Sequence, residues 1–195
     1  MKVIYREGEK ADSHSIAELD YTASGGAAEF LFHDLLPGYS PVQIIASNLE
    51  KDLYPYTYRN AIVAELNNKV IGMSLSFPAT YHQITPEMRE FFPTDRLAHF
   101  QDFFSTRVVG SFFLDALCVL ADCRNQGIGA QLIELTQSKA KEEGYNTLSL
   151  IVFADNVRAQ QLYRQHGFET VRPIELKSHP LIPHQGGCLL MKADL

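Results

Sequence analysis

The most constraining feature of this sequence is a strand, a turn, a helix and a second strand that follow one another without a hairpin. Ser111 to Leu120 is apolar on both alternating faces, which is typical of a strand buried on both sides. A polar turn and a long helical stretch from Gly127 to Glu143 follow, ended by Gly144, and Thr147 to Phe153 reads as a strand. This order predicts a βαβ unit with two parallel strands and a right-handed crossover. We therefore expect an α/β fold with a mixed sheet.

The rest of the chain predicts further helices and an antiparallel hairpin around this unit. The hairpin is expected because two apolar, β-branched runs flank Asn67-Asn68, a pair that tolerates positive φ. The expected strands are Lys2 to Glu7, Ala61 to Leu66, Val70 to Phe77 and Gly187 to Ala193. The expected helices are a segment from Ser13 through Leu19, Ala27 to Leu36, Pro41 to Asp52, Pro86 to Phe92, Asp95 to Phe104 and Asn156 to Gln165.

Residues 78–110 are aromatic, charged and interrupted by proline, so we expect a helical insertion over the core. Because there is no repeat or low-complexity tract, we expect one domain over residues 1–195.

Composition excludes several classes of protein. The formal net charge of -6 leaves no broad basic face for nucleic acid. The longest apolar run, Gly110 to Ala121, is shorter than the ~20 residues of a membrane helix, and no secretory signal precedes the first strand. Three cysteines and scattered histidines match no metal-ligand spacing, so no metal is expected. We predict a cytoplasmic protein without nucleic-acid or membrane partners. The sequence leaves the oligomeric state open, a homodimer included.

The turn before the long helix has the composition of an anion site. Gly127 and Gly129 lack a Cβ, so successive backbone N–H groups can approach an anion at the positive end of the helix, and Arg124 adds a charge. A diphosphate is the expected ligand. A Rossmann fingerprint would need glycine where Leu132 stands, and a Walker loop would need Lys-Ser/Thr after Gly129, where Ala130 follows.

Two motifs in this region resemble those of the GCN5-related N-acetyltransferases (GNAT). Arg124-x-x-Gly127-x-Gly129 after a buried strand resembles motif A, where the turn holds the pyrophosphate of acetyl-CoA. The stretch from Asn156 to Phe168 resembles motif B, Asn-x-x-Ala-x-x-x-Tyr-x-x-x-Gly-Phe. The resemblance implies the GNAT fold, in which two central parallel strands splay apart around the acyl-CoA. It also implies an N-acetyltransferase that transfers the acetyl group directly to an amine of a small molecule or peptide.

The resemblance also implies a set of site residues. Coenzyme contacts are expected from one strand, the turn and one short helix: Leu117, Cys118, Val119, Arg124, Asn125, Gln126, Gly127, Ile128, Gly129, Ala130, Asn156, Ala159 and Tyr163. Tyr163 is the expected acid for the leaving thiolate, because an ordinary phenol pKa of ~10 is close to that of a thiol. Asp115 is the candidate base, because a carboxylate on an apolar strand should have a raised pKa.

Structural roles compete with each of these assignments. Tyr163 would also pack its helix on the sheet, Asn156 is a natural N-cap, and a buried Asp115 would also satisfy backbone donors. Cys118 is expected to be a small core residue rather than a nucleophile. Glu29 and Asp34 would either attract a cationic amine or form a solvated helix face.

Two other functions remain open at this stage. A non-catalytic acyl-CoA sensor of the same fold would not need Tyr163, and transfer of a larger acyl group would depend on the volume of the pocket.

Overall fold

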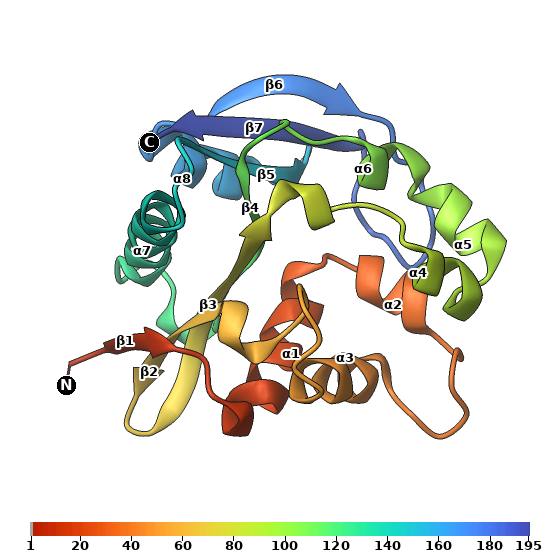
Figure 1. Ribbon diagram of the computed structural model, residues 1–195, viewed down its shortest axis with the longest axis horizontal. Coiled ribbons are helices and arrows are strands. Elements are labelled where there is room, and N and C mark those ends of the chain that lie inside the picture. Colours follow the sequence, from red (N-terminus) through yellow and green to blue (C-terminus); the bar gives the residue numbers. More distant parts are fainter. Residues whose placement is uncertain (1) are drawn as a thin grey trace.

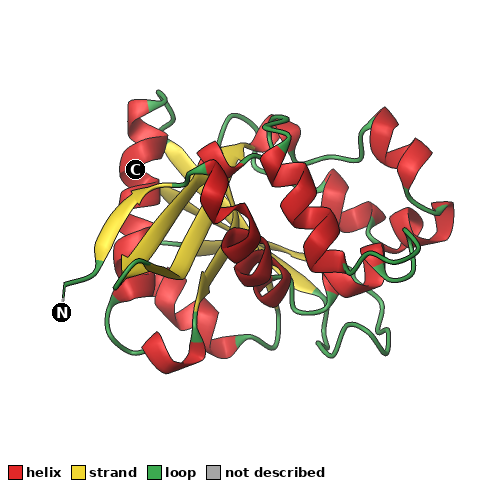
Figure 2. Cartoon of the chain, turned by 90° about the horizontal axis from the view of Figure 1, so that it is seen from below, coloured by secondary structure: helices red, strands yellow, loops and turns green. Residues whose placement is uncertain are grey.

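Seven strands form one mixed sheet at the centre of the computed structural model, which describes residues 2–195, and helices cover both of its faces (Figures 1 and 2). The strands are β1 (Ile4–Glu7), β2 (Ala61–Leu66), β3 (Lys69–Pro78), β4 (Phe112–Val119), β5 (Thr147–Phe153), β6 (Glu169–Ile174) and β7 (Cys188–Asp194). Their order is β1-β2-β3-β4-β5-β7-β6. β4 and β5 run parallel and the other neighbouring pairs are antiparallel, which confirms the predicted βαβ unit and hairpin.

The helices are mostly short. They are α1 (Ser13–Ala23), α2 (Ala27–Phe32), α3 (Pro41–Glu50), α4 (Pro86–Phe91), α5 (Thr94–His99), α6 (Gln101–Ser105), α7 (Ile128–Glu142) and α8 (Val157–Gln165). Single turns of 3-10 helix occur at η1 (Lys10–Asp12), η2 (Tyr58–Asn60), η3 (Ala79–Tyr81) and η4 (Ala121–Cys123). Within residues 2–195, none of the helices combines the length and the hydrophobicity that crossing a membrane requires.

The two faces of the sheet are covered by different parts of the chain. α7 and α8 pack on β4 and β5, with Ile133 and Tyr163 in one apolar cluster with Phe112 and Leu150. On the opposite face, α1 and α3 cover β3 and β4, while residues of α6 and the 175–187 segment contact β5 and β7. α2, α4 and α5 lie on the side of the molecule away from both termini (Figure 1). The core is thus continuous around β4.

Several expected elements differ from the structure, and tertiary packing explains one of the differences. The predicted helix Asp95 to Phe104 is two helices, because the chain turns at Phe100, whose side chain is buried against Phe30. The predicted helix Ala27 to Leu36 ends at Phe32. β6 was not expected: it is a mostly exposed edge strand that pairs with β7 alone and lacks an apolar pattern.

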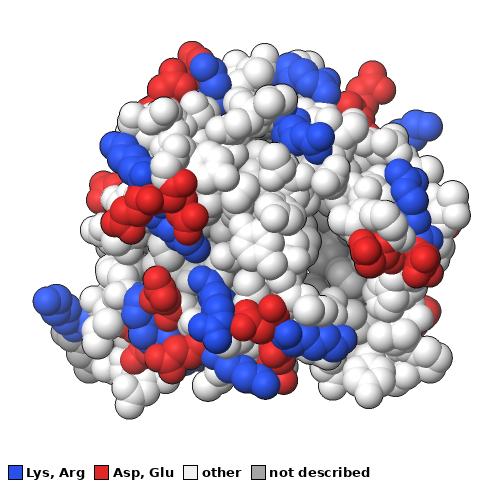
Figure 3. Space-filling model, in the orientation of Figure 1, with Lys and Arg blue, Asp and Glu red and all other residues white. Residues whose placement is uncertain are grey.

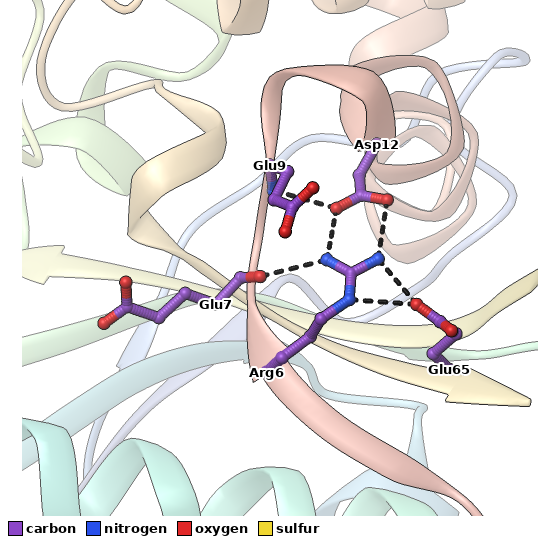
Figure 4. A network of polar contacts seen from close by, with 5 residues as sticks. All are labelled: Arg6, Glu7, Glu9, Asp12 and Glu65. Atoms are coloured by element: carbon purple, nitrogen blue, oxygen red, sulfur yellow. Dashed lines mark hydrogen bonds and ion pairs between the residues drawn. The ribbon is translucent and has the colours of Figure 1, made fainter. Parts of the chain in front are cut away.

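One polar network fixes the opposite edge of the sheet. Arg6 of β1 donates to both carboxylate oxygens of Asp12, at 2.6 and 3.0 Å, and to Glu65 of β2, at 2.7 and 2.9 Å (Figure 4). Asp12 also accepts the Glu9 N–H at 2.8 Å. The Arg6 guanidinium lowers the pKa of Asp12. The network therefore joins β1, β2 and the turn that leads into α1.

Candidate active site

The two parallel strands of the βαβ unit separate part of the way along their length. β4 pairs with β5 at three positions, from Phe112 opposite Leu148 to Leu114 opposite Leu150. Beyond Leu114, no pairing joins β4 to β5, although β4 continues along β3 to Val119. The register between β3 and β4 also shifts here and leaves Asp115 as the extra residue of a bulge. The chain thus has a gap between β4 and β5 that begins at Asp115.

The backbone of β4 offers hydrogen-bonding groups to this gap. Leu120 donates its N–H to Ile71 of β3 at 2.8 Å. Because backbone groups alternate in direction along a strand, those of Cys118 also point to β3, and those of Leu117 and Val119 point to the gap. Of the three residues expected to contact the coenzyme here, these two therefore lie with their backbone groups on the gap side.

The glycine-containing turn caps the N-terminal end of α7. Gly127 has φ 79°, and a Cβ built on it would meet no atom within 4 Å. A Cβ on Gly129 would lie 3.4 Å from Leu162, so this glycine lets α8 approach the first turn of α7. In the described residues, no acceptor is present for the backbone N–H groups from Gln126 to Ala130. Together with the helix dipole, these unpaired amides fit an anion.

Polar side chains tie this turn to β4 and α8. Arg124 donates from Nε to the Val119 carbonyl at 2.9 Å, so its side chain folds back toward the end of β4. Asn125, at φ 63°, accepts from Arg158 at 2.7 Å. Arg158 was not among the predicted contacts, although it stands in the sequence motif. The structure brings this second cation from α8 to the edge of the turn.

α8 packs on β4 and β5 in the same apolar cluster as α7. Asn156 is the N-cap, since its side chain accepts the Ala159 N–H at 3.2 Å. Tyr163 is buried, with a relative exposure of 8%, and packs near Phe168. Burial and the nearby Cys118 of β4 both raise the pKa of Tyr163. No hydrogen bond links the Tyr163 hydroxyl to another of the residues that the structure describes.

Asp115 and two residues that sequence analysis missed lie together on the opposite side of β4. Burial, and then the negative charge of Asp20 on α1, raise the pKa of Asp115 well above its ordinary range. Burial raises the pKa of Asp20 to about 6. The side chain of Tyr56, in the loop before η2, is partly exposed, and its pKa is raised by partial desolvation and then by both carboxylates. A lone acid in a helix and a tyrosine in a loop gave no sequence signal, because only the packing of α1 on β4 brings them together.

The carboxylates expected near an acceptor, Glu29 and Asp34, have partners elsewhere. Glu29 accepts from Tyr21 at 2.7 Å and lies 3.0 Å from Nδ1 of His33, whose Nε2 is 3.1 Å from the exposed Asp34. They therefore form a local group on and after α2. Cys118 is buried, and burial raises the pKa of its thiol, so it fits the predicted core role.

The surface seen in Figure 3 has charged groups mostly toward its edges, with acidic and basic side chains interleaved, around an uncharged middle. A hollow opens to the right of this middle, on the side where Figure 1 shows α2. The net charge of -6 is thus not gathered in one patch on this face.

Three comparisons bear on this arrangement. The model of the Acetyltransferase (GNAT) family matches residues 29–168. Mycothiol acetyltransferase of Jonesia denitrificans is 37% identical over 102 residues, which are 46% of this chain and 32% of that protein. The match therefore spans about a third of that relative.

Solved structures share the fold. One described as an acetyltransferase has a TM-score of 0.71 at 24% identity, covering 98% of both chains. PaiA N-acetyltransferase from Thermoplasma acidophilum, in complex with coenzyme A, has a TM-score of 0.54 at 13% identity, covering 100% of both chains.

Proposed function

The chain belongs to the acetyltransferase (GNAT) family, and on that basis we propose that it transfers an acetyl group from acetyl-CoA directly to a primary amine of a small molecule or peptide. The observation that carries the proposal is the gap between β4 and β5, which ends at the N-terminal end of α7, where a row of amides has no acceptor among the described residues. The position of Tyr163 beside this gap also supports a catalytic role over a sensor role.

The residues of the gap and the turn fit an acyl-CoA. The amides from Gln126 to Ala130 would hold the diphosphate, with Arg158 as a nearby cation. Leu117 would offer its backbone groups, and Val119 its N–H, to the amides of the pantetheine arm, since the Val119 carbonyl already accepts from Arg124. Asn156 and Ala159 belong to the first turn of α8 and would flank the same ligand. When bound, the coenzyme supplies the acetyl thioester.

The side chains around the gap would handle the protons of the reaction. Asp115 accepts a proton from the incoming ammonium, so that a neutral amine is available for attack. Tyr163 donates its phenolic proton to the sulfur that leaves. Its raised pKa keeps the phenol protonated throughout the neutral range.

The test compares two variants of Gly129. Wild-type protein should be stabilised by about 2.7 kcal/mol at a hundredfold excess of acetyl-CoA over Kd, and should release thiol when an accepted amine is added. Gly129→Ala adds only an ordinary contact with Leu162 and should keep most of the stabilisation. Gly129→Asp places a negative charge at the helix N-terminus, which favours the helix itself but repels a diphosphate. It should fold and lose the stabilisation.

The measurement is the melting temperature with and without acetyl-CoA, with NAD as a control. Absence of a shift in the wild type at millimolar acetyl-CoA would contradict the coenzyme site. A shift without thiol release from any amine would indicate a sensor.

A further inference from the structure

We infer that Asp20 of α1 and Asp115 of β4, with Tyr56 beside them, form the acceptor end of the site and receive the acceptor amine as an alkylammonium ion. The inference rests on the proposed function and specifies its acceptor. It also adds two residues to the site.

The geometry of α1 directs Asp20 toward β4. Ile16 and Ala17, one turn earlier on the same helix, have no exposed surface and pack in one cluster with Ala116 and Cys118. Residues three and four apart share a helix face, so Asp20 continues the face that contacts β4.

The bulge on β4 brings Asp115 to that same side of the sheet. Phe113 lies on the α1 face, in a cluster with Phe77, and Ala116 packs with α1. Since Asp115 is the extra residue between them, its side chain also lies on this face. The two carboxylates thus come from different elements and lie on the same face of β4, near the point where β4 leaves β5.

Tyr56 closes the third side. Its ring lies 5.4 Å from that of Phe77, edge to face. The loop is held by Arg59, which donates to Asp52 at 2.7 Å, and by Asn60, which donates to the Pro55 carbonyl at 2.7 Å. These hydrogen bonds hold the loop that contains Tyr56 in place.

Among residues 2–195, neither carboxylate has a cation as a partner. In residues 2–195, no hydrogen bond or ion pair joins the carboxylate of Asp20 or Asp115 to another side chain, and both residues are half-buried. The groups that face Asp115 are the Asp20 carboxylate from α1 and the Tyr56 hydroxyl. Cys118, farther along β4, has Arg124 beside it. Two desolvated acids without a counter-ion hold a proton more tightly than isolated acids do, and they favour a ligand that brings positive charge.

A second residue, Tyr163, lies near the same part of β4. Tyr163, more than nine-tenths buried and without a hydrogen-bond partner for its hydroxyl in the described residues, lies close to Cys118, which also feels the charge of Asp20. The acids and the phenol therefore approach the same stretch of β4. An acyl donor between them would have a proton acceptor on one side and a proton donor on the other.

The proton balance follows from this arrangement. The ammonium gives one proton to Asp115, and the nitrogen lone pair forms the C–N bond to the acetyl carbonyl. As the C–S bond breaks, the sulfur takes a proton from Tyr163, and the second proton lost by nitrogen restores the phenol. Asp115 then releases its proton to water, and the products are the amide and the free thiol.

The first test measures the two carboxylates directly, by carbon-13 NMR titration of the protein without turnover. We expect the pKa of Asp115 to fall in Asp20→Asn, because the neighbouring negative charge is removed, and to fall in the wild type when n-butylamine is added. Glu18→Gln is the control, since Glu18 is an exposed carboxylate on the same helix. If neither the substitution nor the amine changes the Asp115 pKa, the inference is wrong.

The second test uses three amines with four carbon atoms each: n-butylamine, 1,4-diaminobutane and 4-aminobutyrate. We expect 4-aminobutyrate to have a kcat/KM at least roughly tenfold below that of n-butylamine, because the carboxylate at its other end is repelled by the acidic pair when its amine binds there. In Asp20→Asn this difference should shrink, and the acidic limb of the pH profile should move to lower pH by about one unit. Glu18→Gln should change neither.

The outcomes separate the two proposals. Loss of acetyl-CoA binding and of thiol release with every amine in the wild type counts against the proposed function. An active enzyme that prefers 4-aminobutyrate, or whose pH profile is the same in Asp20→Asn, overturns the inference alone.

Discussion

At the residue scale, burial and neighbouring groups give particular chemical properties to side chains that look ordinary in the sequence. Tyr163 was predicted from the motif in which it stands, and the structure adds that it is buried beside β4. Asp115 was predicted because it interrupts an apolar strand, and it lies at the bulge where the strands part. Asp20 could not be predicted, because its meaning depends on a contact between elements about ninety residues apart in the sequence.

The role of Tyr163 is tested by removing only its hydroxyl. Tyr163→Phe keeps the ring against Phe168 and should lower kcat by roughly ten- to a thousandfold, while the Kd of acetyl-CoA changes little. Burial raises the pKa of this phenol, so its proton is less easily given to a thiolate than that of a free phenol, and we expect less than the largest effects of general acids. Steady-state kinetics with any accepted amine gives kcat, and calorimetry gives Kd. An unchanged kcat would show that another group protonates the thiol.

At the scale of elements, the sequence predicted the features that are set by neighbouring residues and missed those that are set by tertiary packing. The hairpin turn was predicted from Asn67-Asn68, and both residues have positive φ. β6 was missed because, as an exposed edge strand, it has no buried face to impose an apolar pattern. The break at Phe100 was missed because burial of its ring in the cluster around α2 sets the direction of the chain there.

The polar network at β1 gives a prediction for an element. Arg6→Gln removes a charge that two partly buried carboxylates share, and should lower the free energy of unfolding at pH 7 by about 2 kcal/mol. The pKa of Asp12 is lowered in the folded protein, so this stabilisation is present above the ordinary pKa of Asp and is lost as pH falls through the lower, folded value. Urea unfolding at pH 7 and near pH 3 should therefore show a smaller difference between the proteins at the lower pH. Lys69→Gln, at the first residue of β3, is the control. An equal difference at both pH values would contradict the assignment to this ion pair.

At the scale of the whole molecule, the fold could be predicted because the motifs around β4 and β5 are long and ordered along the chain. The proposed acceptor side could not be predicted, because it combines α1, β4 and the loop before η2, and no sequence motif spans these three segments. Its charge also differs from the expectation, since Glu29 and Asp34 lie with His33, while Asp20 and Asp115 have no such partner in the part of the chain that the structure describes.

The net charge of -6 should affect how fast a cationic amine arrives. Because acidic and basic groups are interleaved on the face in Figure 3, we expect a modest effect: kcat/KM for 1,4-diaminobutane should fall a few-fold when ionic strength is raised from low to physiological, where the Debye length is about 8 Å. n-Butylamine, with half the charge, should show a smaller decrease. If kcat/KM decreases equally with ionic strength for the two amines, only the acids within the site, and not the net charge of the protein, influence binding of the amine.

The order of strands has a consequence for how the chain acquires its structure during synthesis. β7 lies between β5 and β6, but it comes after both of them in the chain. As the chain leaves the ribosome, β6 therefore has no neighbour to pair with, and the outer edge of β5 stays open until Cys188–Asp194 has emerged. Open edges invite pairing with other chains. During this interval the open edges of β5 and β6 can bind chaperones or other copies of the chain. The interval ends when β7 inserts between the two strands.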